Sequence, residues 1–487
     1  MTEEYADLGE LPHGWIRTRL GEIAEVILGQ SPPSSSYNED RKGLPFYQGK
    51  LEFGRLHPTP GKWCTASKKI AQEGDVLISV RAPVGPTNVC PAESCIGRGL
   101  AAIRGLGGIG TLFILYLLRA FENEIARKGT GTTFSAIGGD QLKKLEIPLP
   151  PLNEQVRIVA RLEELFARLD AGVEGLRKVK AQLKRYRQAV LKYAFEGKLT
   201  EERRKTHKDH IEPATKLLEN IKQERKKDPK RKELPPINIS NLSELPENWT
   251  WTRLGEIGIV ASGGTPSTKI PEYFDGDVPW ITPADLSDFT DKFIHRGRRN
   301  ISEKGLNSSS TVLLPEGTIL FSSRAPIGYV AIAANPVSTN QGFKNLILYK
   351  GIFNEYIFYY LKASKILAES YGSGTTFREV SAARFSLIPI PLAPLDEQHR
   401  IVEEIEQRLS FVDETQKTIA QAIRQSDRLR QSILKIAFEG RLVSQDPSDE
   451  SAEKLLERIK EERAKSMGEK DTNRKNKSQL ELSTYVE

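Results

Sequence analysis

The sequence repeats itself, and this duplication decides which architectures are open to it. Five blocks recur in the same order, the first at an offset of 234 residues and the others at 243. The pairs are Thr18–Ile23 and Thr252–Ile257, Arg81–Gly85 and Arg324–Gly328, Gly129–Phe134 and Gly372–Phe377, Ile147–Arg157 and Ile390–Arg400, and Lys192–Leu199 and Lys435–Leu442. Collinear blocks do not arise by chance, so the chain consists of two related halves. Between the blocks the halves differ, as Ser31–Trp63 and Ser267–Ile301 show.

Each half divides into a mixed domain and a long helix. About 140 residues rich in Gly, Pro, Ser and aromatics contain short β-prone runs such as Val76–Val80, bounded by turn residues, which predict a compact mixed domain. A Pro-rich hinge follows, and then apolar residues recur in steps of three and four from Leu162 to Tyr193. This heptad pattern predicts a helix from Asn153 to Ala194, and the second half keeps it less strictly from Ile405 to Ala437.

Two such helices on one chain can pack against each other. Because the copies run in the same order, an antiparallel pair with pseudo-twofold symmetry is the compact solution, and a parallel pair is the alternative. The predicted fold class is α+β: two mixed α/β domains joined by two long helices that form an antiparallel coiled coil. The expected boundaries are domain 1 at 1–152, helix 1 at 153–199, a charged linker at 200–244, domain 2 at 245–393, helix 2 at 394–442 and a charged tail at 443–487, disordered from Glu469.

Composition narrows the class of protein. The net charge is +7 and the pI about 9.0, which suits a polyanionic partner, but Gly197–Lys232 alone holds thirteen basic and seven acidic residues. Its short motif Lys216–Glu219 (KLLE) recurs in the tail as Lys454–Glu457. The longest apolar run is far shorter than the roughly 20 residues of a membrane span, and no signal peptide is evident, so we expect a cytosolic protein. Three cysteines match no zinc pattern and are expected to be buried thiols: Cys64, Cys90 and Cys95.

Catalytic motifs are largely missing. The sequence has no Walker A, HExxH, G-x-S-x-G or EF-hand pattern, and no methyltransferase Asn/Asp-Pro-Pro-aromatic element. Gly105, Gly107 and Gly110 form a GxGxxG after a β-prone run, but the equivalent place in the second half reads Lys350-Gly351-Ile352, without the other glycines. We therefore expect no dinucleotide site and no active site on this chain.

The repeated polar residues instead suit nucleic-acid binding. Arg81 and Arg324 each follow a β-prone run, where an arginine can grip a phosphate or pair with guanine; an ion pair within the domain is the equal alternative. Gly-x-Gly-Thr-Thr-Phe loops offer N–H groups and hydroxyls to phosphate, or are only tight turns. Arg98 in one half and Asn340 and Gln341 in the other occupy equivalent places and can read base edges. The candidate DNA contacts are Arg81, Arg98, Thr132, Thr133, Arg324, Asn340, Gln341, Thr375 and Thr376.

These repeated blocks resemble a known family. Each half opens with Leu-Pro-x-x-Trp and Arg-Leu-Gly-Glu-Ile, closes its domain with Ile-Pro-Leu-x-Pro-Leu-x-Glu-Gln, and ends its helix with Ala-Phe-Glu-Gly. From Leu11 to Leu442 this order resembles the specificity subunit of type I restriction-modification systems. The resemblance implies that the two domains are target recognition domains, each binding one half of a bipartite double-stranded DNA site, and that the helices set the spacer.

The resemblance also implies partners. Two methyltransferase subunits would dock on the helices, and restriction subunits would join them. S-adenosylmethionine, Mg and ATP would bind those partner chains, and this chain would bind no cofactor. The repeated Glu-Gln-x-Arg residues would contribute to docking: Glu154, Gln155, Arg157, Glu397, Gln398 and Arg400. Two alternatives remain, a targeting subunit of a related restriction system and a non-catalytic coiled-coil adaptor that binds proteins.

Overall fold

A computed structural model describes residues 10–129, 136–206, 212–226, 233–240, 242–374 and 378–465. The chain divides into two compact units. Unit 1 comprises Met1–Leu176 and Ala420–Glu487, and unit 2 comprises Arg177–Ile419. Each unit therefore contains one mixed domain and a segment of each long helix.

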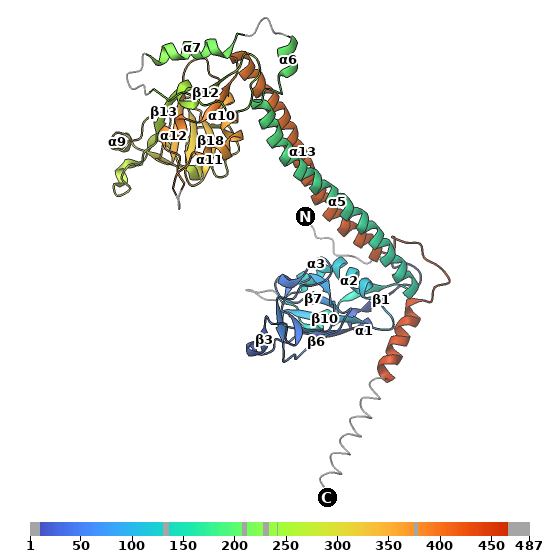
Figure 1. Cartoon of the computed structure of the whole chain (residues 1–487). Helices are drawn as coiled ribbons and strands as arrows, with labels where there is room; N and C mark the ends of the chain where they lie inside the picture. Colours follow the sequence, from blue (N-terminus) through green and yellow to red (C-terminus); the bar gives the residue numbers. More distant parts are fainter. Residues whose placement is uncertain are drawn as a thin grey trace. The chain divides into compact units, whose positions relative to one another are not determined.

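In unit 1 the mixed domain is built from two main sheets and a two-stranded ribbon (Figure 1). The strand orders are β2-β10-β7-β8, β3-β5-β4-β9-β6 and β1-β11. The strands are β1 (Ile16–Arg19), β2 (Ala24–Leu28), β3 (Tyr37–Asn38), β4 (Leu44–Tyr47), β5 (Lys62–Cys64), β6 (Ile70–Ala71), β7 (Val76–Ser79), β8 (Thr87–Val89), β9 (Ser94–Ile96), β10 (Leu100–Gly105) and β11 (Glu146–Leu149). The helices are α1 (Leu20–Ile23), α2 (Thr111–Ala120), α3 (Glu122–Lys128) and α4 (Gly139–Lys143). All three cysteines are free and buried, which confirms the expectation.

The domain of unit 2 repeats this plan with a different second sheet. The strand orders are β13-β20-β17-β18-β15, β16-β14-β19 and β12-β21. The strands are β12 (Thr250–Arg253), β13 (Gly258–Ser262), β14 (Phe274–Ile281), β15 (Phe293–Ile294), β16 (Arg299–Ile301), β17 (Ile319–Ser323), β18 (Ile327–Ala333), β19 (Ser338–Thr339), β20 (Phe343–Leu348) and β21 (Pro389–Leu392). The helices are α8 (Leu254–Ile257), α9 (Glu303–Asn307), α10 (Asn354–Ala363), α11 (Lys365–Ser370) and α12 (Ala382–Ser386).

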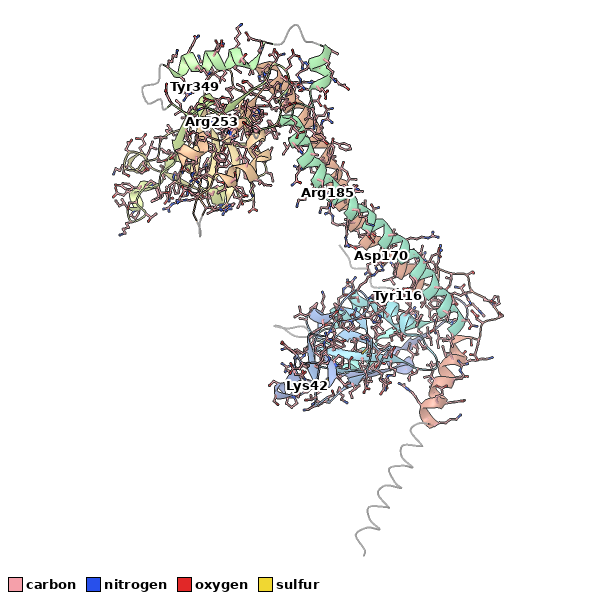
Figure 2. All side chains as sticks on the ribbon, in the orientation of Figure 1. Lys42, Tyr116, Asp170, Arg185, Arg253 and Tyr349 are labelled. Atoms are coloured by element: carbon pink, nitrogen blue, oxygen red, sulfur yellow. The ribbon has the colours of Figure 1, made fainter. Side chains whose placement is uncertain are left out.

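The two long helices are α5 (Leu152–Phe195) and α13 (Leu395–Phe438). The bounds of α5 lie within one residue of the predicted Asn153–Ala194, whereas α13 begins ten residues before the predicted pattern from Ile405 to Ala437 and ends one residue after it. In unit 1, Asp170 of α5 pairs with Arg430 of α13 at 2.5 Å, and in unit 2, Arg187 pairs with Asp413. Both pairs place residues whose numbers add up to 600 opposite each other. Unit 1 contains the beginning of α5 and the end of α13, and unit 2 contains the end of α5 and the beginning of α13, so the helices are antiparallel. This confirms the antiparallel arrangement and excludes the parallel one. Figure 2 shows Asp170 on α5 and Tyr116 of α2 nearby in unit 1.

Each long helix contributes its last turn to a domain core. In unit 1, Phe438 packs on Phe113 of α2, with ring centroids 5.7 Å apart. In unit 2, Phe195 packs on Tyr356 and Tyr360 of α10, at 5.2 and 5.1 Å. The core of each domain thus includes the helix end of the other repeat, which explains why the Ala-Phe-Glu-Gly block is duplicated.

The charged linker and the charged tail each supply a further helix, and each of these helices packs on the domain of the other repeat. In unit 2, linker helix α7 (Ala214–Arg225) buries Ala214, Leu218 and Ile221, and the amide of Ala214 donates to the carbonyl of Asn248 (2.9 Å). In unit 1 the tail helix, residues 452–465, buries Ala452, Leu455 and Ile459, and the amide of Ala452 donates to Gly14 (2.9 Å). A short helix, α6 (Glu201–Thr206), precedes α7. The repeated KLLE motif therefore marks a docking helix, and the tail beyond residue 465 lies outside the described residues.

Candidate nucleic-acid interface

The candidate arginines lie at the ends of equivalent central strands. Arg81 follows β7 and is exposed, and Arg324 follows β17 and is partly exposed. In both loops the following Ala–Pro peptide bond is cis. The strand positions are fixed by buried apolar residues on β7 and β17, so both arginines stand on rigid supports at the same end of the two sheets.

Backbone hydrogen bonds bring the second group of candidates beside these arginines. Val80 donates to the carbonyl of Gly99 (2.9 Å), which places the Arg81 loop next to the loop that carries Arg98. The equivalent bond joins Ser323 to Gly342 (2.7 Å), so Arg324 lies near the loop of Asn340 and Gln341. Arg98 and Gln341 are exposed, whereas Asn340 is half-buried and its Oδ1 accepts from Gly342 N–H (2.9 Å). The structure therefore gathers the candidates into one cluster in each domain.

A third loop completes each cluster and was missed by the sequence comparison. Residues 29–32 (GQSP) and 263–266 (GGTP) follow β2 and β13 at the offset of 234. A Cβ on Gly29 would lie 2.2 Å from the carbonyl oxygen of Gly97, and one on Gly263 would lie 1.9 Å from that of Asn340, so only glycine permits this approach. Ser31 Oγ accepts from the amide of Arg98 (3.2 Å), and Thr265 donates to Gln341. This short Gly-x-Ser/Thr-Pro repeat was the available signal.

The sheets that differ between the halves attach at this cluster. In unit 1, β4 pairs in parallel with β9, the strand just before Arg98. In unit 2, β14 pairs in parallel with β19, the strand just before Asn340. The non-repeated stretches therefore add different strands beside equivalent loops. Each domain has a shared frame, meaning the repeated first sheet and its loops, and a second sheet that differs between the domains.

The four threonines lie outside the described residues: Thr132, Thr133, Thr375 and Thr376. The flanking residues are described. Ile137 donates to the carbonyl of Val80, and Val380 to that of Ser323, both at 3.0 Å. The described residues that follow these segments in the sequence therefore lie beside the arginine loops.

The repeated Glu-Gln pairs lie inside the protein. Trp15 Nε1 donates to Glu154 (2.9 Å) and Trp249 Nε1 to Glu397 (2.8 Å), and all four Glu and Gln side chains are at most 7% exposed. Gln155 and Gln398 donate to the carbonyls of Pro150 and Ala393. These bonds join each helix to its own domain, which gives the repeated Glu and Gln an internal role.

The arginines of this motif are more accessible and differ between the units. Arg157 pairs with Asp449 of the tail at 2.7 Å, and this contact lowers the pKa of the Asp449 carboxyl. Arg400 instead pairs with Glu403 and Glu404 on its own helix, at 2.9 and 3.2 Å. Any partner contact from this motif would therefore involve Arg157 and Arg400 rather than the buried pairs.

Substitution of glutamine for Glu397 should destabilise the protein, whereas the same substitution at Glu154 should not. Glu397 also contacts Thr200 (2.5 Å) and pairs with Arg204, so E397Q leaves a mostly buried arginine without its counterion and should cost about 3 kcal/mol of unfolding free energy. Burial raises the pKa of the Glu154 carboxyl, so ionisation is unfavourable there and E154Q should cost nothing at pH 7.

The pH dependence provides the check. Because the folded pKa of Glu154 lies above its unfolded value, the wild type regains stability relative to E154Q as the pH falls through that folded pKa. In denaturant unfolding, E154Q should therefore match the wild type at pH 7 and become less stable than the wild type as the pH is lowered. Equal losses for E154Q and E397Q at pH 7 would contradict the assignment.

The glycine motif has a packing role in this structure. A Cβ on Gly107 would lie 2.4 Å from Ile459 of the tail helix, and one on Gly351 would lie 2.7 Å from Leu217 of α7. The glycines therefore make room for the docking helices. Within the described part of the chain, no group of three His, Cys, Asp or Glu side chains is arranged to hold a metal ion. None of the described helices combines the length and apolarity of a membrane span.

Comparison with known protein families decides the relationship. The type I restriction modification DNA specificity domain matches the chain twice, over residues 12–179 and 246–425. The chain belongs to this family. Each specificity domain covers one mixed domain and the first part of the helix that follows, so the duplication is a pair of specificity domains.

Curated relatives of the specificity family match over part or all of the chain. The MjaIX specificity subunit of Methanocaldococcus jannaschii is 46% identical over 165 residues, or 33% of this chain and 38% of the relative. The MjaX subunit of that organism is 40% identical, and the match spans 45% of its length, so these two matches cover less than half of either relative. The EcoDI specificity subunit of Escherichia coli is 28% identical over 96% of this chain and 99% of its own length.

Two solved structures share the fold of this chain. A chain from a structure of the assembly and conformational transition of the type I R-M system has a TM-score of 0.62 at 21% identity, covering 89% of this chain and all of that one. The HsdS subunit from Thermoanaerobacter tengcongensis has a TM-score of 0.55 at 22% identity, with 89% and 98% covered. These similarities establish the two-domain architecture with long helices.

Proposed function

We propose that this chain is the DNA sequence-recognition subunit of a type I restriction-modification complex and that each domain binds one half of a bipartite target. The observation that carries the proposal is the pairing of a shared frame with a different second sheet. Two domains with equivalent arginine loops can bind DNA in the same manner, while their different sheets present different side chains to the bases.

Methylation mapping tests this proposal. The chain is co-expressed with the methyltransferase of its own system, and methylated bases are mapped across a genome. The expected result is one bipartite motif with a fixed gap, and a continuous motif or none would contradict it. Binding should also weaken steeply as salt rises, because lysine and arginine contacts with phosphate release counterions. A protein-binding adaptor would show neither behaviour.

Docking of methyltransferase subunits on the paired helices is part of the same proposal. In unit 2, Val179, Tyr186 and Tyr193 of α5 recur every seven residues and are 40%, 41% and 46% exposed. A row at this spacing follows one stripe of a helix and suits a partner helix. Two methyltransferase chains and the restriction chains would supply catalysis with S-adenosylmethionine, Mg and ATP, in a cytoplasmic complex.

Aspartate substitutions in this row of α5 should prevent docking of the methyltransferase without unfolding the helix. The variant V179D/Y193D should abolish co-purification with the methyltransferase, since two aspartates would be desolvated in the interface. The helix should stay folded because both positions are substantially exposed. Circular dichroism and thermal unfolding provide the control, and undiminished co-purification of the folded variant would exclude this row as a docking site.

A further inference from the structure

The equivalent arginines of the two clusters have different surroundings. In unit 2, Arg324 Nη1 lies 3.3 Å from Glu379 Oε2, and Lys344 Nζ lies 3.2 Å from Glu379 Oε1. In unit 1 the positions equivalent to Lys344 and Glu379 are Ala101 and Ala136. Among the described residues Arg81 has no carboxylate partner.

The lysine explains why the glutamate is held in place. The side chain of Lys344 is only 8% exposed, and it also donates to Ser323 Oγ at 3.3 Å. A buried ammonium requires a counterion, so Lys344 fixes Glu379 through one carboxylate oxygen. The other oxygen faces Arg324, and the glutamate therefore links a buried cation to a partly exposed one.

We propose that Glu379, anchored by Lys344, positions Arg324 to read a guanine, whereas Arg81 contacts a DNA phosphate. This inference rests on the proposed function. The glutamate engages Nη1, and the edge formed by Nη2 and Nε has no partner within the described residues. Two parallel hydrogen bonds to guanine O6 and N7 require a fixed orientation of the guanidinium plane. A carboxylate on one edge supplies that orientation before DNA binds, which reduces the entropy lost on binding.

Arg81 has no carboxylate that fixes its guanidinium, and a contact with phosphate does not require a fixed orientation. A phosphate accepts hydrogen bonds over a wide range of directions and carries no sequence information, so a mobile arginine serves it well. The two domains would thus use one repeated loop for two purposes. Ala101 and Ala136 would leave Arg81 free to contact phosphate, and Lys344 and Glu379 would position Arg324 for a base. The competing explanation is that Glu379 only neutralises Lys344.

The test uses the full chain with its methyltransferase, and methylated motifs are mapped for each variant. R324K keeps the charge but loses the planar fork, so preference at one base of one half-site should fall about tenfold to a hundredfold. K344A/E379A gives domain 2 the two alanines of domain 1 and keeps Arg324, and it should broaden the same base position. Removal of both charges leaves neither one unpaired, and hydrogen exchange checks that the domain is folded.

R81A is the matched variant in domain 1. It should weaken binding to all sequences by a similar factor and reduce the salt slope by about one, without changing either half-site. An unchanged motif with R324K would overturn base reading by Arg324. Broadening with R324K but not with folded K344A/E379A would overturn positioning by Glu379. A wild-type protein that yields no bipartite motif would instead contradict the proposed function.

Discussion

Alanine at Leu455 and Ile459 of the tail helix should unfold the first domain and leave the second intact. Both side chains are at most 1% exposed and pack on the loop at Gly107. Each substitution removes buried methyl and methylene groups and leaves a cavity, at a cost of about 2 to 5 kcal/mol. The pair would therefore remove much of a stability that is typically about 5 to 15 kcal/mol for a domain.

Hydrogen exchange resolved by peptide should locate the effect. Strands β7 and β10 should lose protection while β17 and β20 keep it. The matched variant L218A/I221A in α7 removes equivalent contacts in unit 2 and should reverse the pattern. A uniform loss over both domains, or protection unchanged in both, would show that these helices do not belong to the two cores.

Removal of one heptad from both long helices should change the spacing of the recognised half-sites and leave the half-sites themselves unchanged. Residues 181–187 of α5 face 413–419 of α13 in unit 2, as the Arg187–Asp413 pair shows, so deleting both segments preserves the register. Seven residues shorten a helix by about 10 Å, which corresponds to at most about three base-pair steps of DNA.

The shortened protein should stop modifying the original sites and should modify sites with a shorter gap. Seven residues make almost two full helical turns, so the exposed faces change direction by only about 20°. Deleting residues 181–187 alone is the control, because it breaks the pairing of the helices and should abolish modification at any spacing. Altered half-sites at an unchanged gap would contradict the assignment of spacing to the helices.

Much of this fold was predictable because a feature that recurs in both repeats is more reliable than one that occurs once. Apolar periodicity gave α5 within one residue of both observed ends, since a heptad pattern over 40 residues has few other interpretations. The less regular pattern of the second half begins ten residues after α13 does. Chain order favoured an antiparallel pair but left a parallel pair open, and the contacts between the helices decided between the two. The arginine loops were found because Arg81 and Arg324 each begin a repeated Arg-Ala-Pro-Val/Ile-Gly block.

Other features depend on contacts that no local pattern encodes. The repeated Glu-Gln pairs suggested an accessible surface, yet Trp15 and Trp249 bury them through hydrogen bonds across more than a hundred residues of sequence. Linker and tail were too charged to form cores alone, and only the structure shows which domain their helices complete. Lys344 and Glu379 were overlooked because they have no counterparts in the other half.

The exchange of helix ends also has a consequence for how the protein is made. Unit 2 is one continuous stretch, Arg177–Ile419, whereas unit 1 needs Ala420–Glu487 as well as its N-terminal residues. On the ribosome the second domain therefore has all its parts first, although it is encoded later. The first domain must wait, with the surface around Gly107 uncovered, until the tail helix emerges from the exit tunnel.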